Sequence, residues 1–290
     1  MSLIVTGATG SLGRLAVEQL LALGVPAREI VATGRDAERL TDLSKLGVEV
    51  RAADYDQPAS LDAAFEGAQR ILLVSAGVPG PQRVQQHHNA IAAARAAGAG
   101  LVAYTSIVNA DTSTLRMAED HQATEALLRE SGVPFTLLRN SWYIENYTAQ
   151  LANHLEYGVV HGSAGEGRVS AATRADFAAA AAAVLTTDGH GNHTYELGGD
   201  EGFTLAEYAA EITAQSGREV RYADLPEREY ASALAGHGVP QGFADVLADA
   251  DRGLSRGELF TDSGDLRRLL KRRTTTLSEA VAAALRDTAS

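Results

Sequence analysis

Three glycines near the N-terminus have a spacing that could bind a phosphorylated ligand. Gly7, Gly10 and Gly13 follow a short apolar run and precede a helical apolar pattern. This order predicts a strand, a tight turn and a helix. Gly7 would allow the turn, Gly10 would let a pyrophosphate approach the backbone, and Gly13 would let the helix pack closely on the sheet. We therefore expect a nucleotide site at this turn.

The remaining residues of the turn, Thr9, Ser11 and Leu12, complete the predicted phosphate loop. Phosphate would meet the free N–H groups and positive end of the helix, which Ser11 could help to cap. The spacing Gly-x-x-Gly-x-x-Gly differs from the commoner Gly-x-Gly-x-x-Gly, and a plain turn is the alternative. Its place directly after a first strand, followed by repeated strands and helices, favours a dinucleotide.

The residue after the second predicted strand indicates which dinucleotide binds. At this place an acidic residue binds the ribose hydroxyls, whereas an arginine accepts a 2′-phosphate. Arg35 therefore favours NADP(H), and the alternative is that Asp36 binds the ribose of NAD. Asp54, after the third predicted strand, could accept a hydrogen bond from the adenine amino group or cap the helix that begins near Pro58.

Small and hydroxyl-bearing residues end the fourth and fifth predicted strands. Ligands of open α/β sheets gather at the carboxyl ends of the strands, where small residues let the backbone approach a cofactor. The cofactor-binding residues predicted there are Ser75, Ala76, Gly77, Thr105 and Ser106.

The strands that must position these residues alternate regularly with helices. The six predicted strands are residues 3–6, 29–33, 48–51, 71–74, 101–106 and 135–139. The alternation predicts an α/β fold of the Rossmann type, a doubly wound parallel sheet.

Beyond residue 150 this rhythm changes. Residues 1–150 form the predicted NADP-binding domain, and residues 151–290 form a smaller, mainly helical C-terminal substrate lobe. We expect residues 175–200 to return to the first domain. The elements expected after residue 150 are a glycine-rich loop at 158–167, a helix over 175–184 and strands at 194–197 and 219–222.

Composition excludes several classes of function. The 290 residues carry a net charge of −12, which disfavours nucleic acid and anionic membranes as partners. The basic run at 267–273 is expected to be a solvated helix face. The absence of cysteine excludes disulfides and thiolate catalysis, and the eight histidines suggest no metal site. Without an apolar stretch long enough to cross a bilayer, a cytoplasmic protein is expected, with a homodimer as one assembly to test.

The placed motifs resemble those of the NmrA-like atypical short-chain dehydrogenases/reductases. Within that family, the chain is most similar to the bacterial type 2 NAD(P)H:quinone oxidoreductases, and the likeness covers its full length. The segments that carry it are 6–13, 104–106, 110–113, 137–147, 165–168, 172–176 and 274–277, together with Arg35 and Asp54. The resemblance implies a Rossmann fold, NADP(H) and a quinone substrate.

The chain departs from the wider superfamily at the catalytic acid. Ordinary members carry a serine and a Tyr-x-x-x-Lys pair, in which the lysine lowers the pKa of the tyrosine. Aligning the family's glutamate with Glu125 puts His121 at the lysine position and Met117 at the tyrosine position, although Ser106 is kept. A quinone tolerates this loss, because hydride addition gives a delocalised hydroquinone anion that solvent or a weak donor can protonate. The sequence thus predicts NADPH-dependent two-electron reduction of quinones.

The predicted catalytic residues are His121, Asn140 and Tyr143. Asn140, Trp142 and Tyr143 follow the sixth strand and would form the substrate pocket, although packing between lobe and sheet is the alternative for the two aromatic residues. His121 could relay a proton, or could simply bond a neighbouring backbone group. Tyr104 lies inside a strand and is expected in the core.

A second function also fits a chain without the tyrosine and lysine. A non-enzymatic NADP(H)-sensing regulator that binds a protein partner, as the resemblance to NmrA regulators implies, would lose the same residues. The enzyme is favoured because the specific motifs match the quinone reductases.

Overall fold

Seven parallel strands form the central sheet of the computed structural model, which describes residues 2–236 and 238–288. The strand order in the sheet is β3-β2-β1-β4-β5-β6-β8. Strands β1 to β3 are added toward one edge of the sheet, and the later strands are added toward the other edge, starting beside β1. The doubly wound Rossmann-type fold is confirmed. The strands are β1 (Ser2–Val5), β2 (Ile30–Gly34), β3 (Glu49–Ala52), β4 (Ala68–Leu73), β5 (Leu101–Ile107), β6 (Phe135–Asn140) and β8 (His193–Leu197).

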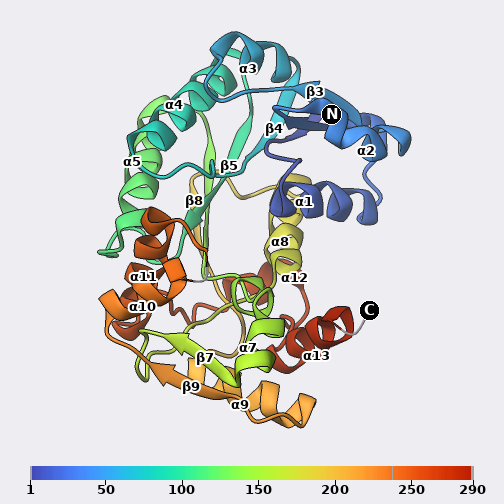
Figure 1. Cartoon of the computed structure of the whole chain (residues 1–290). Coiled ribbons are helices and arrows are strands. Elements are labelled where there is room, and N and C mark those ends of the chain that lie inside the picture. Colours follow the sequence, from blue (N-terminus) through green and yellow to red (C-terminus); the bar gives the residue numbers. More distant parts are fainter. Residues whose placement is uncertain (1, 237, 289–290) are drawn as a thin grey trace.

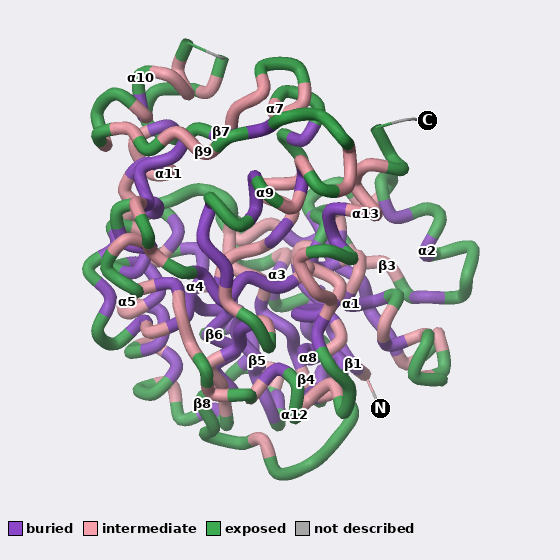
Figure 2. Tube along the Cα trace, turned by 90° about the horizontal axis from the view of Figure 1, so that it is seen from below, coloured by how far each residue is buried: buried purple, intermediate pink, exposed green. Residues whose placement is uncertain are grey.

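Helices cover both faces of the sheet (Figure 1). One layer contains α1 (Ser11–Ala22), α8 (Arg174–Thr186) and α12 (Asp265–Leu270), and the other contains α3 (Pro58–Ala64), α4 (Pro81–Ala96) and α5 (Arg116–Ser131). Apolar cores lie on both sides, which is why every residue of β5 is buried. Figure 2 shows the buried segments concentrated in these central strands.

The connection between β2 and β3 consists of two short helical turns. It forms a 3₁₀ turn, η2 (Ala37–Leu40), and a short helix, α2 (Thr41–Lys45). A second 3₁₀ turn, η1 (Ala27–Glu29), precedes β2. The side chain of Asp36 caps η2, which starts the tight turn before a full helix can form.

The remaining elements form a lobe at the carboxyl edge of the sheet, below it in Figure 1. They are α6 (Glu145–Thr148), α7 (Leu151–Tyr157), β7 (Val159–Gly162), α9 (Leu205–Ser216), β9 (Arg221–Asp224), α10 (Glu227–Gly236), α11 (Gln241–Ser255) and α13 (Leu277–Thr288). A separate apolar core stabilises this lobe.

The prediction of a glycine-rich loop at residues 158–167 is wrong, because part of this segment forms the strand β7. This strand pairs in parallel with β9, about the strand expected at 219–222, and forms a two-stranded sheet. The strand expected at 194–197 is β8, which pairs with β6 and extends the six expected strands to seven. Both α8 and β8 thus pack with the main sheet, although they follow the first lobe elements in the chain.

Candidate active site

The glycine turn between β1 and α1 is tightly folded on itself. Gly7 has a φ of +62°, which favours glycine. A Cβ on Gly13 would lie 2.5 Å from the Gly7 carbonyl oxygen, so the close approach is to the turn rather than to the strands of the sheet. A Cβ on Gly10 would meet the same oxygen at an ordinary 3.4 Å. The protein therefore requires glycine at positions 7 and 13, whereas at Gly10 the space stays open for a ligand.

The N-terminus of α1 is available to an anion. Its N-cap is Gly10, which offers no side-chain acceptor. Ser11 is the first helical residue and is exposed, so its expected capping role is wrong. The first-turn N–H groups and the positive end of the helix can therefore bind a phosphate. Thr9 packs against the end of β2, where a Cβ on Gly34 would lie 2.7 Å from Thr9 Cγ2.

Arg35 and Asp36 lie differently at the end of β2. The Arg35 side chain is exposed and makes no hydrogen bond or ion pair with another described residue. Asp36 Oδ1 accepts a 3.1 Å hydrogen bond from the backbone N–H of Glu38. Because Asp36 is engaged in the cap, Arg35 is the side chain available to a ligand here.

Asp54 closes a turn after β3. Its Oδ1 accepts a 3.0 Å hydrogen bond from the N–H of Asp56, and Oδ2 lies 3.4 Å from Gln57 Nε2. The N-cap of α3 is Gln57, so Asp54 organises the turn before the helix without capping it. Its contact with adenine stays a prediction.

Two side chains fix the loop after β4. The N–H of Ser75 donates to Thr105 Oγ1 at 2.9 Å, which explains the position of Thr105 beside this loop. The N–H of Ala76 donates to Nε2 of His87 on α4, also at 2.9 Å. The loop that is predicted to contact the cofactor is thus held from β5 on one side and from α4 on the other.

The hydrogen bonds of His87 determine its tautomer. Since Nε2 accepts from Ala76, Nδ1 carries the hydrogen and donates to Thr124 Oγ1 at 2.8 Å, while that hydroxyl donates to the Asp120 carbonyl. Burial, aided by the charge of Arg83, lowers the pKa of His87 to about 3. His87 is therefore neutral, as its role as an acceptor requires. The sequence does not distinguish it from its exposed neighbour, His88.

Stability is expected to fall in mild acid because of this histidine. The pKa of His87 is lower in the folded protein than its ordinary value of 6.5, so its contribution is complete above about pH 6.5 and is lost as pH falls toward about 3. In urea unfolding, His87→Gln should reduce the dependence of unfolding free energy on pH by up to about 1.4 kcal/mol per pH unit. His88→Gln should leave it unchanged, and an equal slope in all three proteins would contradict the assignment.

A cavity of about 1160 Å³ lies between the carboxyl ends of β4, β5 and β6 and the lobe. Residues of α6, α7, α10 and α11 close it from the lobe side. The predicted residues that line it are Ser75, Gly77, Ser106, His121, Asn140, Trp142 and Tyr143. The structure thus gathers all three predicted catalytic residues, whereas Arg35 and Asp54 lie at the other half of the sheet, after β2 and β3.

His121 is buried, and its bonding differs from the backbone contact considered above. Nδ1 lies 2.7 Å from the hydroxyl of Tyr104, which is itself fully buried in β5. Burial, followed by the charges of Arg83 and His87, holds the pKa of His121 well below its usual range. The imidazole is neutral at neutral pH, so it can form a hydrogen bond with a ligand but carries no extra proton to donate as an imidazolium.

Ser106 lines the cavity, but its hydroxyl hydrogen is donated to a buried carboxylate. The hydroxyl donates to Glu125 Oε1 at 2.7 Å, and the two oxygens of Glu125 also accept from Arg139 at 2.9 and 2.7 Å. Arg139 Nη1 also lies 2.7 Å from Glu196 Oε1, so this arginine forms ion pairs with both glutamates. A carboxylate can only accept hydrogen bonds, so the Ser106 hydroxyl is the donor to Glu125. Its oxygen can then act toward a ligand only as an acceptor. The resemblance pointed to Glu125, but nothing in the sequence pattern identified its partner Arg139.

Asn140 and Tyr143 meet at the end of β6. The Asn140 Oδ1 atom is buried and has no hydrogen-bond partner among the described residues, so it can accept from a ligand. Burial raises the pKa of Tyr143, although a hydrogen bond with the Asn140 side chain lowers it. The Tyr143 ring packs on Phe177, and the Arg174 guanidinium lies 4.6 Å from the ring centre. Tyr143 therefore both packs the lobe on the sheet and lines the cavity.

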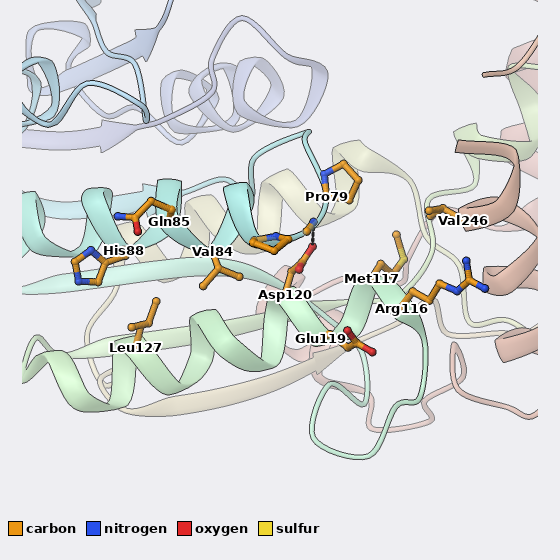
Figure 3. A pocket seen from close by; sticks show the side chains of 12 residues that line it. Pro79, Val84, Gln85, His88, Arg116, Met117, Glu119, Asp120, Leu127 and Val246 are labelled. Atoms are coloured by element: carbon orange, nitrogen blue, oxygen red, sulfur yellow. Dashed lines mark hydrogen bonds between the residues drawn. The ribbon is translucent and has the colours of Figure 1, made fainter. Parts of the chain in front are cut away.

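A second, more open cavity of about 920 Å³ lies between α4 and α5 (Figure 3). Asp120 accepts a 2.7 Å hydrogen bond from the N–H of Gly80 at its edge. Met117, at the position of the superfamily's tyrosine, lines both cavities and brings no acid to either. In the described residues, no cluster of histidine and carboxylate side chains is placed to hold a metal ion, and no helix has the length and apolarity needed to cross a membrane.

Comparison with known proteins places these features in a family. Residues 7–188 match the family described as NAD(P)H-binding. The chain belongs to this NAD(P)H-binding family. It is 49% identical over 277 residues to quinone oxidoreductase 2 of Escherichia coli (strain K12), covering 96% of each chain.

Two solved structures superpose closely on the chain. The E. coli NADPH-dependent quinone oxidoreductase QOR2, complexed with NADPH, has a TM-score of 0.94 and 47% identity, covering 98% of this chain and 99% of that chain. The Citrobacter sp. triphenylmethane reductase also has a TM-score of 0.94, with 37% identity and coverage of 99% and 100%. The resemblance to NmrA-like quinone oxidoreductases is confirmed.

Proposed function

We propose that this chain catalyses the NADPH-dependent two-electron reduction of quinones. NADPH, when bound, supplies a hydride, and the protein supplies position and surroundings. The similarity to the E. coli enzyme supports this function, and so does a cavity that adjoins the predicted cofactor loops.

The residues present fit this cofactor. The uncapped turn at Gly10 and the N-terminus of α1 would hold the pyrophosphate, and Arg35 would hold the 2′-phosphate. The nicotinamide carboxamide carries two N–H donors, which the unpartnered Asn140 Oδ1 and the lone pairs of Ser106 would accept. These residues would fix the ring beside the acceptor.

The hydrogen bond from Ser106 to Glu125 is the observation that carries the proposal. The Ser106 hydrogen is donated to Glu125, Met117 replaces the tyrosine and His121 is neutral, so none of the superfamily's three catalytic positions supplies an acid to the cavity. A ketone reduced here would form an alkoxide of high proton affinity, which needs such an acid. A quinone forms a delocalised anion, which needs only a hydrogen bond and access to solvent.

Steady-state turnover tests this proposal. We expect NADPH oxidation with benzoquinone or menadione and none with simple ketones. Failure to oxidise NADPH with any quinone, despite measurable NADPH binding, would contradict it. That outcome, together with a cofactor-dependent protein partner, would support the regulator instead, which the similarity to an oxidoreductase disfavours.

Arg35→Ala should separate the two nicotinamide cofactors. Loss of a charge-assisted hydrogen bond to the 2′-phosphate should weaken NADPH binding by roughly 1.5–3 kcal/mol, or about 10- to 150-fold, and leave NADH binding nearly unchanged. Dissociation constants measured by fluorescence titration check this. Arg39→Ala removes an exposed arginine of the same turn and serves as the control. An equal loss for both cofactors would remove Arg35 from the phosphate site.

A homodimer and a cytoplasmic location complete the proposal as predictions. Light scattering coupled to size-exclusion chromatography tests the first, and fractionation of cells that express the protein tests the second.

A further inference from the structure

An acidic group lies at the lobe end of the large cavity. Asp251 on α11 lines this cavity and is only 6% exposed. Its Oδ2 accepts a 2.8 Å hydrogen bond from the N–H of Ser163, and Oδ1 has no partner among the described residues. The carboxyl group therefore keeps one oxygen for a ligand.

Two phenols line the cavity near this carboxyl group. The Tyr147 hydroxyl on α6 is buried without a hydrogen-bond partner among the described residues, and Tyr230 on α10 lines the same cavity. Burial raises the pKa of both phenols, and the nearby charge of Asp251 raises it further. A carboxylate beside electron-rich rings attracts a cationic nitrogen, through ion pairing and cation–π contact.

No side chain in the described residues neutralises Asp251 by an ion pair. Asp224 on β9 adds negative charge nearby, and Tyr222 donates to Asp224. Arg252, the next residue on α11, lies 3.9 Å from Glu227 on α10.

Two histidines, His154 and His161, also line this end of the cavity. His154 on α7 has its pKa lowered by burial to about 4, and its Nδ1 lies 3.3 Å from the Tyr208 hydroxyl. His161, on β7, is exposed. Burial and Asp224 raise the pKa of Asp251 to about 7 against the Ser163 hydrogen bond, so its charge appears as pH rises through neutrality.

We propose that the lobe end of the cavity is a subsite for a cationic nitrogen group carried by the electron acceptor, with Asp251 as the residue that selects it. The subsite rests on the proposed function only in that the acceptor is a quinone. The favoured substrates are then quinones that bear a quaternary or protonated amine away from the ring that accepts the hydride.

A matched pair of acceptors tests the subsite. One naphthoquinone carries a trimethylammonium arm, and the other carries an uncharged tert-butyl arm of the same shape. Wild-type protein at about pH 8 should show a KM about tenfold lower for the charged quinone, a preference that shrinks toward about pH 6 as Asp251 gains a proton.

Asp251→Asn should abolish this preference at every pH, because the amide keeps the shape and can accept from Ser163 but has no charge. Asp245→Asn removes a carboxylate of the same helix that does not line the cavity, and should retain the preference. An equal preference in wild type and Asp251→Asn would overturn the subsite. So would a fall in kcat for both quinones with an unchanged KM ratio.

Binding without turnover separates the subsite from the proposed function. Calorimetric titration of phenyltrimethylammonium into the NADP⁺-loaded protein should show binding that Asp251→Asn loses. Binding by a protein that reduces neither quinone would refute the proposed function and support the subsite. No binding to wild type would refute the subsite.

Discussion

Gly13→Ala should abolish productive NADPH binding and destabilise the protein. The new Cβ would lie 2.5 Å from the Gly7 carbonyl oxygen and 2.9 Å from the N atom of Ala8, both of which are backbone atoms that cannot move without opening the turn. We expect a loss of about 1–3 kcal/mol in the free energy of unfolding. We also expect a fall of about two orders of magnitude in NADPH affinity, because the phosphate-binding N–H groups would be displaced.

Gly10→Ala is the matched control for this prediction. Gly10 has φ −95° and ψ 165°, which alanine adopts freely, and the new Cβ would meet its nearest protein atom at 3.4 Å. The variant should therefore unfold like wild type and yet bind NADPH weakly, because the methyl group would occupy the approach of the pyrophosphate. Unfolding curves and NADPH titrations on both variants check the pair. Normal NADPH affinity in Gly13→Ala would refute this account of the turn.

Glu125→Ala should be among the most destabilising single substitutions in the chain. It would leave Arg139, whose side chain is 4% exposed, without its most deeply buried counter-charge, and it would release the Ser106 hydroxyl. Removing one partner of a buried ion pair costs about 3–5 kcal/mol. Chemical denaturation measures the loss.

Arg129→Ala provides the comparison at the same carboxylate. Arg129 contacts Glu125 at 2.9 Å from a half-exposed position, so its removal should cost no more than about 1 kcal/mol. Similar losses in the two variants would show that the buried Arg139 does not depend on Glu125.

The parts of the fold that depend on local pattern were predictable. The glycine turn follows directly from β1, and each buried strand has its own apolar run, so their order was readable without distant contacts. The position of Arg35 directly after β2 was predictable for the same reason, because it depends only on counting along one strand.

Features made by distant contacts escaped prediction. β7 is four residues long and flanked by glycine, and it forms only because β9, some sixty residues later, pairs with it. One local feature was also mispredicted: Ser11 has a typical capping side chain, but Gly10 occupies the cap position. His87 and His88 are identical in sequence terms, and only the position of the loop at Ala76 distinguishes them.

The catalytic site could be predicted from the sequence only in part. Loss of the tyrosine and lysine is visible in the sequence, and the structure adds that the Ser106 hydroxyl donates its hydrogen to Glu125. Asp251 could not be assigned to the cavity from the sequence, since α11 reaches it from a different part of the chain.

A single-turnover experiment tests the central claim most directly. Protein loaded with one equivalent of NADPH is mixed anaerobically with one equivalent of quinone, while NADPH absorbance and a semiquinone radical signal are followed. We predict complete oxidation of NADPH, an equal amount of hydroquinone and no semiquinone. NADPH that stays bound and reduced, or a semiquinone formed in proportion to the cofactor consumed, would contradict two-electron quinone reduction by this protein.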